Sequence, residues 1–131
     1  MAPPEFLLDR SLGRYQLADA LRAEGLVVHT LWSVYGAAEQ RLEDHDWVAD
    51  AGLHGWIVLS ADKRLRYSVN TRRLAMHQVG VFQLASGNLT GREQVRWYLD
   101  NLKAIRLACT EPKPFIYSVH KRHIERVWPK L

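Results

Sequence analysis

Residues 55–62 read Gly-Trp-Ile-Val-Leu-Ser-Ala-Asp, a run of four large apolar residues followed by a small polar segment and a carboxylate. A short, uninterrupted apolar run of this kind is typical of a strand that is buried on both faces of a sheet. The same pattern occurs near the start of the chain, where residues 5–9 read Glu-Phe-Leu-Leu-Asp. We therefore expect two buried strands, the first followed by Asp9 and the second by Asp62.

The rest of the chain alternates between apolar runs and helical spacing. Further strands are predicted at residues 26–31, 79–84 and 115–119, and helices at residues 17–24, 37–41, 43–51, 72–76 and 92–107. Alternation of strands and helices predicts a mainly parallel sheet with helices on both faces. We expect a single three-layer α/β/α domain over residues 1–131, with about five strands and a basic C-terminal tail at residues 120–131.

Composition narrows the class of protein. A chain of 131 residues with 47% hydrophobic and 24% charged residues matches one ordinary globular domain. The single cysteine, Cys109, excludes an intrachain disulfide and a zinc site built on clustered thiolates. We expect no membrane helix, because no apolar run approaches the roughly 18 to 20 residues that one needs. The first ten residues lack the order of a signal peptide, so we expect a cytoplasmic protein.

The two halves of the chain carry opposite charge. Residues 1–62 hold 4 Lys or Arg against 10 Asp or Glu, a net charge of −6, whereas residues 63–131 hold 14 against 4, a net charge of +10. A basic half is typical of proteins that bind a polyanion such as nucleic acid. The acidic half fits the same function if some of its carboxylates hold divalent cations. The alternative is a solvated surface on which the charges merely segregate.

Three aspartates are candidates for one site. In parallel sheets, ligands bind beyond the carboxyl ends of the strands, which is where Asp9 and Asp62 are expected. Asp44 begins the helix that leads into the strand before Asp62, and a helix start can lie at the same edge of the sheet. Carboxylates brought this close repel each other unless a cation lies among them, and Mg²⁺ or Mn²⁺ suits their hard oxygen atoms. Taken singly, each aspartate could instead be a helix cap or turn former.

Three segments of the chain, in this order and spacing, resemble PIN-like domains of the VapC toxin type. They are residues 6–13 (Phe-Leu-Leu-Asp-Arg-Ser-Leu-Gly), residues 44–48 (Asp-His-Asp-Trp-Val) and residues 55–63 (Gly-Trp-Ile-Val-Leu-Ser-Ala-Asp-Lys). The resemblance implies a PIN fold and a metal-dependent ribonuclease that hydrolyses RNA phosphodiester bonds, often as the toxin of a toxin–antitoxin pair. Its partners would be RNA and a cognate antitoxin.

The resemblance also implies roles for individual residues. Asp9, Asp44 and Asp62 would be the metal-binding acids, with Asp46 as a fourth catalytic acid and Glu43 as a weaker candidate. Ser11 would orient Asp9 or contact phosphate. PIN nucleases commonly carry a further acidic residue shortly after the third-strand aspartate, but here residues 63–66 read Lys-Arg-Leu-Arg. This departure favours one tightly held ion, with a second recruited by substrate.

The mechanism implied is attack on the phosphodiester by a metal-activated water, which requires no nucleophilic side chain. Basic residues that follow Asp62 are candidates for gripping RNA phosphates; they are Lys63, Arg64, Arg66, Arg72 and Arg73. We expect Arg64 to stabilise charge in the transition state, although any of these side chains could instead lie on a solvated helix face.

Aromatic residues divide into two groups. Trp47 and Trp56 lie in apolar patterns and are expected in the core. Trp32 and Tyr35, in an expected connection, are the better candidates for stacking on an unpaired base. A homodimer is a further expectation, with its contact at Trp97 and Leu99 of the long helix.

Two other classes of protein stay open at this point. A phosphoacceptor receiver domain shares the parallel layout and Mg²⁺-binding aspartates, but Asp9 lacks the adjacent acidic partner of receivers, and Lys113-Pro114 precedes a predicted strand instead of following one. The second class is a non-catalytic PIN-fold module that binds RNA or a protein partner. A nuclease should stop with EDTA, whereas such a module would be indifferent to metal.

Overall fold

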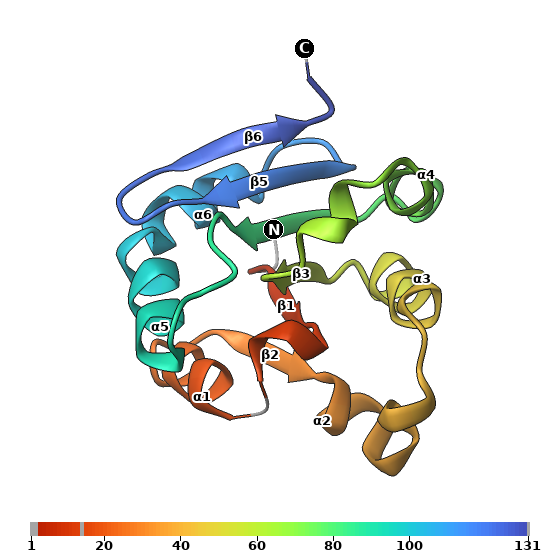
Figure 1. Ribbon diagram of the computed structural model, residues 1–131, viewed down its shortest axis with the longest axis horizontal. Coiled ribbons are helices and arrows are strands. Elements are labelled where there is room, and N and C mark those ends of the chain that lie inside the picture. Colours follow the sequence, from red (N-terminus) through yellow and green to blue (C-terminus); the bar gives the residue numbers. More distant parts are fainter. Residues whose placement is uncertain (1–2, 14, 131) are drawn as a thin grey trace.

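The computed structural model describes residues 3–13 and 15–130 and forms a six-stranded sheet between two layers of helices (Figure 1). The strands are β1 (Glu5–Leu8), β2 (Val27–Thr30), β3 (Ile57–Ser60), β4 (Gly80–Leu84), β5 (Phe115–Val119) and β6 (Ile124–Trp128). The helices are α1 (Gln16–Ala23), α2 (Leu31–Tyr35), α3 (Asp44–His54), α4 (Ser68–His77), α5 (Gly91–Asp100) and α6 (Leu102–Ala108). Short 3₁₀ helices cover Arg10–Leu12, Gly36–Arg41 and Lys63–Arg66.

The strand order in the sheet is β2-β1-β3-β4-β5-β6, and every neighbouring pair except β5 and β6 is parallel. The predicted three-layer α/β/α fold is therefore confirmed. Leu8 of β1 lies opposite both Thr30 of β2 and Leu59 of β3. The chain leaves β1 in one direction across the sheet to reach β2 and then returns past it to β3, so the strand order reverses at β1. Ligand sites of parallel sheets lie at such a reversal.

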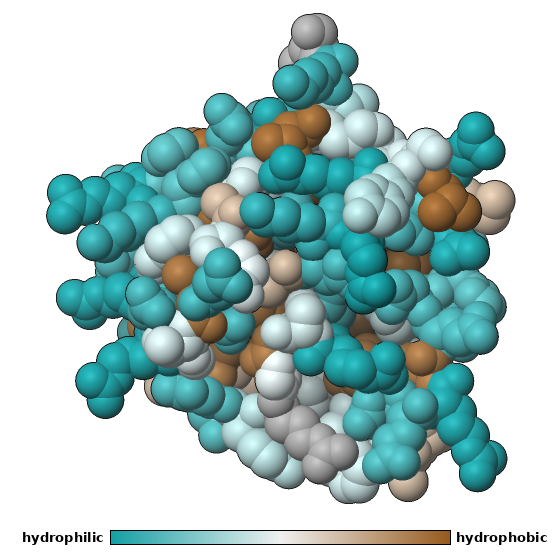
Figure 2. All heavy atoms as spheres, viewed as in Figure 1, coloured by the Kyte–Doolittle hydropathy of each residue, from teal (hydrophilic) through white to brown (hydrophobic). Residues whose placement is uncertain are grey.

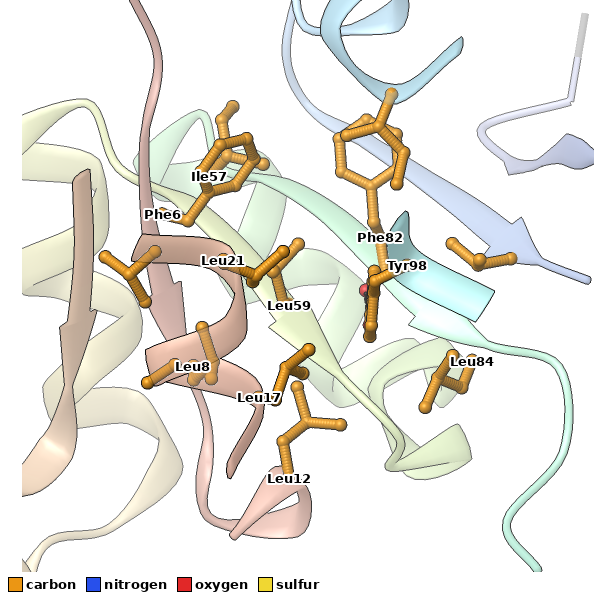
Figure 3. Packing of buried hydrophobic residues seen from close by; sticks show 14 of the residues in the cluster. Phe6, Leu8, Leu12, Leu17, Leu21, Ile57, Leu59, Phe82, Leu84 and Tyr98 are labelled. Atoms are coloured by element: carbon orange, nitrogen blue, oxygen red, sulfur yellow. Dashed lines mark hydrogen bonds between the residues drawn. The ribbon is translucent and has the colours of Figure 1, made fainter. Parts of the chain in front are cut away.

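Neighbouring residues of β1 point to opposite faces of the sheet, as the strand period of two requires. Phe6 and Leu8 pack with α1 and with Tyr98 of α5 in one core cluster (Figure 3). Leu7 belongs to a second cluster on the other face, together with Trp47 of α3. Figure 1 shows α1, α5 and α6 on the first face and α3 and α4 on the second.

Trp47 and Trp56 are 2% and 9% exposed, so both lie in the core, as predicted.

The segment expected to be a basic tail, residues 120–131, contains strand β6. Residues 124–128 pair antiparallel with β5, and Val127 and Trp128 pack against the second core cluster. Basic residues on both sides of β6 hide its strand character in the sequence. The sheet therefore has six strands, where about five were predicted. Residues 120–123 connect β5 to β6, and Pro129 and Lys130 follow the strand.

Two helical predictions also differ from the structure. The expected connection after β2 is the short helix α2, because Thr30 and Ser33 form a capping box in which each side chain accepts the other residue's backbone N–H. The expected helix over residues 92–107 is two helices that meet at Asn101. The Asn101 side-chain amide donates to the backbone carbonyls of Trp97 and His120, so it ties the break to the end of β5.

Trp97 and the neighbouring Leu99 pack partly against the first core cluster, so the expected homodimer contact there stays a prediction.

Among residues 3–13 and 15–130, no helix has both the length and the apolar character needed to cross a bilayer. On the face that Figure 2 shows, hydrophobic residues occur in small patches between hydrophilic ones.

Candidate active site

The predicted aspartates lie at one edge of the sheet, around a pocket of about 190 Å³. Asp9 follows β1, Asp62 follows β3, and Asp44 is the first residue of α3. The pocket is lined by Asp9, Arg10, Ser11, Asp44, Asp62 and Arg64. Asp44 is 35 positions after Asp9, and Asp62 is 18 positions after Asp44. Asp9 and Asp62 lie close together because β1 and β3 are neighbouring strands that run in the same direction. Asp44 joins them from the start of α3.

Two serine hydroxyls hold the buried carboxylate of Asp9. The Ser11 hydroxyl donates to one of its oxygens and the Ser60 hydroxyl donates to the other, while the Ser11 backbone N–H donates to Asp9 Oδ1 at 2.9 Å. The Ser11 oxygen also accepts the Ala61 N–H at 2.8 Å, and the Ser60 oxygen accepts the Asp62 N–H at 2.9 Å. Through Ser11 and Ser60, these bonds connect the Asp9 carboxylate to the backbone of Ala61 and Asp62.

Burial dominates the ionisation of Asp9. The residue is 5% exposed, and desolvation raises the pKa of its carboxyl from 3.8 to about 6, although the bonds from Ser11 and Ser60 act in the opposite direction. The negative charge of Asp62 adds to the rise. Burial therefore brings the pKa of the Asp9 carboxyl close to neutral pH.

Asp62 is paired with Arg64 inside the same pocket. Arg64 Nη2 lies 2.7 Å from Asp62 Oδ2, and Arg64 Nε lies 2.9 Å from Oδ1. Hydrogen bonds from Arg64 lower the pKa of the Asp62 carboxyl. The Asp62 carboxylate in turn raises the pKa of the guanidinium, and the charge of Asp44 acts in the same direction. The acidic pocket therefore already attracts one cationic group of the chain itself.

Asp44 is fixed by the helix that it begins. Its Oδ1 accepts a hydrogen bond from the indole Nε1 of Trp47 at 3.2 Å, one turn further along α3. Because Trp47 is buried in the second core cluster, this bond orients the carboxylate from the core side.

Other predicted residues lie outside this pocket. Asp46 Oδ2 accepts the Glu43 backbone N–H at 3.1 Å, so both of these acids belong to the N-terminal cap of α3. Arg66 Nε donates to Gln83 Oε1 at 2.9 Å. Arg72 and Arg73 lie on α4 and are not among the pocket-lining residues. Their roles in catalysis or RNA binding stay predictions.

Three residues of the site were missed in the sequence. Arg10 lines the pocket and donates to the backbone carbonyl of Glu39. Ser60 bonds to Asp9, as described above. Gln83 of β4 is fully buried and donates to the backbone carbonyl of Asp62. A signal existed for Gln83 alone, since it is the one polar residue in the apolar run of residues 79–84.

The hydroxyl of Tyr98, on α5, is hydrogen-bonded to the backbone at the end of β3. It accepts the Ser60 backbone N–H at 3.2 Å and lies 2.9 Å from the carbonyl oxygens of Ser60 and Phe82, to one of which it donates. Helix α5 is thereby bonded to the last residue of β3.

Comparison with known proteins gives two matches that agree with this geometry. The family model described as "PIN like domain" matches residues 4–86, which include all three aspartates. The chain is also 33% identical over 122 residues to "Putative ribonuclease VapC45" of Mycobacterium tuberculosis, covering 92% of this chain and 88% of that protein. The chain is a PIN-like domain of the VapC type. No solved structure gives a significant match.

The PIN-like domain places its acids around a common pocket without bringing them into a ligand shell. In the part of the chain that the structure describes, no group of three or more His, Cys, Asp or Glu side chains is positioned to hold a metal ion. Each of the three aspartates instead accepts hydrogen bonds from neighbouring groups: Ser11 and Ser60, Arg64, and Trp47.

Proposed function

We propose that this PIN-like domain is a Mg²⁺- or Mn²⁺-dependent endoribonuclease that acts as the toxin of a toxin–antitoxin pair. The observation that carries the proposal is the pocket in which Asp9, Asp44 and Asp62 meet at the carboxyl ends of parallel strands. The ribonuclease name of the Mycobacterium tuberculosis relative supports the same activity.

The donor set of the pocket fits a hard divalent cation. Asp9, Asp44 and Asp62 would hold it through carboxylate oxygens, which Mg²⁺ and Mn²⁺ prefer. The pairing of Arg64 with Asp62 supports this assignment, because it indicates that the field of the pocket favours positive charge. A bound ion would supply an activated water and neutralise charge that develops on the phosphate.

The remaining residues of the pocket orient and bind. Ser11 and Ser60 hold the Asp9 carboxylate in one direction, so little reorganisation is needed when the site is loaded. Arg10 and Arg64 line the same pocket and would bind phosphate oxygens of the RNA. Arg66, held by Gln83 beside this pocket, would extend that contact along the strand.

Metal dependence of cleavage tests the proposal. We expect the purified chain to cut single-stranded RNA with Mg²⁺ or Mn²⁺, to stop when EDTA is added, and to recover when the metal is restored in excess. The measurement is gel analysis of end-labelled RNA. Cleavage that persists in EDTA, or none with either metal, would contradict the proposal.

The second candidate function is a PIN-fold module that binds RNA or a protein without cutting. It is favoured by the basic segment Lys63–Arg66, which stands where PIN nucleases commonly carry a further acid. The same titration separates the two candidates, because RNA binding by such a module would not change with EDTA.

Arg64 competes with a divalent cation for Asp62 in this proposal. We expect Arg64→Gln to bind Mn²⁺ a few-fold more tightly, the effect typical of an exposed ion pair, and to bind RNA more weakly because a phosphate contact is lost. Free Mn²⁺ measured by electron paramagnetic resonance reports the first effect without any activity assay. The matched control is Lys63→Gln, which removes the same charge one residue away. Equal Mn²⁺ affinity in the two variants would show that Arg64 is no competitor.

A cognate antitoxin is the protein partner in the proposed function. The product of a short reading frame beside the gene is the first protein to test for binding to this chain and suppression of cleavage. A cytoplasmic location also stays a prediction.

A further inference from the structure

A second cavity adjoins the acidic pocket. It has a volume of about 140 Å³ and shares Asp9 and Arg10 with the acidic pocket. Whatever occupies it is therefore next to any group held between the three aspartates. In the proposed function, that group is a divalent cation, and the scissile phosphate of an RNA strand would lie against it.

The walls of this cavity combine apolar residues with an aromatic side chain. Leu8 and Leu31 are 1% and 4% exposed and form the apolar part of the lining, and Trp32, 44% exposed, also lines the cavity. Arg10, with a side chain 54% exposed, lies at the border shared by the two cavities and pairs at 3.4 Å with Glu39, which also lines this cavity. A flat apolar surface beside a cation suits a nucleotide, because the base stacks on an aromatic ring while the cation contacts the adjoining phosphate.

The position of Trp32 is fixed by its surroundings. Thr30 is the last residue of β2 and lies opposite Leu8 of β1. Its side-chain hydroxyl caps α2 by accepting the Ser33 backbone N–H at 3.0 Å. Trp32 is the second residue of this capped helix, and its neighbour Leu31 is anchored in the second core cluster. Placement on a capped turn that starts at the end of a strand fixes the backbone of Trp32 beside the cavity that its side chain lines. Tyr35, the other aromatic expected to stack, donates to Asp50 and is half-buried, so it does not share this role.

We propose that the cavity lined by Leu8, Arg10, Leu31 and Trp32 binds an unpaired nucleobase next to the scissile phosphate, with Trp32 as the stacking platform. The inference rests on the proposed ribonuclease function and deepens it, since it names the residues that would contact the base beside the scissile phosphate. A base inside a duplex is stacked on both faces and cannot enter the cavity.

Oligonucleotide binding tests this base site. Trp32→Ala is made in the Asp62→Asn background so that the strand stays intact, and the probes are a single-stranded RNA hexamer of mixed sequence and an abasic strand with the same number of phosphates. We expect Trp32→Ala to weaken hexamer binding by about 5- to 150-fold, the range for losing one stacked base. Binding of the abasic strand should not change, because only phosphate contacts hold it. Fluorescence anisotropy measures both.

Three further variants make the result decisive. Trp32→Phe keeps an aromatic face and should restore most of the hexamer affinity, whereas Trp32→Leu keeps apolar volume without a ring and should not. Leu107→Ala, an exposed position on α6 that is 73% exposed, is the surface control. Equal hexamer affinity in Trp32→Ala and its parent would overturn the inference, as would equal losses for hexamer and abasic strand. A cavity used by a protein partner instead of RNA would give the first of these results.

The two proposals fail separately. If the unaltered chain cleaves RNA with Mg²⁺ but Trp32→Ala binds the hexamer normally, only the base site is wrong. If the unaltered chain does not cleave but Trp32→Ala still loses base-dependent binding, the ribonuclease function is wrong and the base site stands.

Discussion

Replacing Asp62 by asparagine is expected to lower the rate of RNA cleavage by more than about 100-fold, since even residues that only orient metal ligands cost about 10- to 100-fold in metal affinity or activity. The change removes a full negative charge from the pocket but keeps the size of the side chain. The asparagine oxygen can still accept the Arg64 backbone N–H, as Asp62 Oδ1 does at 2.9 Å, so the fold should persist. Cleavage of end-labelled RNA with saturating Mg²⁺ is the measurement, and circular dichroism checks the fold.

The matched control for this result is Asp19→Asn. Asp19 lies on α1, its side chain is 71% exposed, and it pairs at 3.8 Å with Arg22, away from the acidic pocket. The control loses the same charge and should cleave at the unaltered rate. Cleavage by Asp62→Asn within a few-fold of Asp19→Asn would remove Asp62 from the proposed metal site.

Replacing Asp9 by asparagine is expected to stabilise the metal-free protein at neutral pH. The carboxyl pKa is about 6 in the folded chain against an ordinary value of 3.8, so the folded state binds the proton more tightly than the unfolded state. The stabilising contribution of the protonated group is complete below pH 3.8 and is lost as the pH rises through 6. At about 1.4 kcal/mol for each pKa unit, the free energy of unfolding of the variant should gain about 2 to 3 kcal/mol on the unaltered chain between pH 4 and pH 8.

Urea unfolding in EDTA at several pH values measures this difference. Asp19→Asn should show no comparable trend, because its side chain is exposed to solvent. A difference between Asp9→Asn and the unaltered chain that stays constant from pH 4 to pH 8 would contradict the interpretation. Added Mn²⁺ should stabilise the unaltered chain more than the variant, since Asp9 is then a ligand.

The sequence predicted the strands and their aspartates because burial on both faces leaves a plain signature. Residues 6–8 and 57–59 are uniformly apolar, and each run is followed by a buried polar residue, Asp9 or Ser60. The family resemblance pointed to the same residues by short motifs. Asp44 needed the additional idea that a helix start can share an edge with strand ends, which its place in the pocket bears out.

The partners of these aspartates could not be predicted in the same way. Ser60 reaches Asp9 because Leu59 and Leu8 are in register across β1 and β3, and the chain between the two strands carries no sign of that register. Arg10 is held beside the pocket by hydrogen bonds to the backbone carbonyls of Glu39 and Leu42. Every residue has a backbone carbonyl, so the residue types give no sign of these contacts.

Short or mixed elements were also difficult to predict. Helix α2 has five residues, too few for a helical period to appear, and only its Thr-x-x-Ser cap marks it. Strand β6 reads Ile-Glu-Arg-Val-Trp and lies among basic residues, so it was interpreted as part of a basic C-terminal tail. The break at Asn101 depends on a bond to His120, a residue 19 positions further along the chain.

The bond between Tyr98 and the end of β3 determines how rigidly the pocket is held. The tyrosine is 1% exposed and covered by the first core cluster, so the Ser60 amide can be released to solvent only if a core side chain leaves its place. Local fraying, the usual behaviour of strand ends, is therefore suppressed at the end of β3, where the Ser60 hydroxyl donates to Asp9 and accepts the Asp62 backbone N–H. Helix α5, none of whose residues lines the acidic pocket, thus holds the end of β3 in place. Slow hydrogen exchange of the Ser60 amide would show this rigidity.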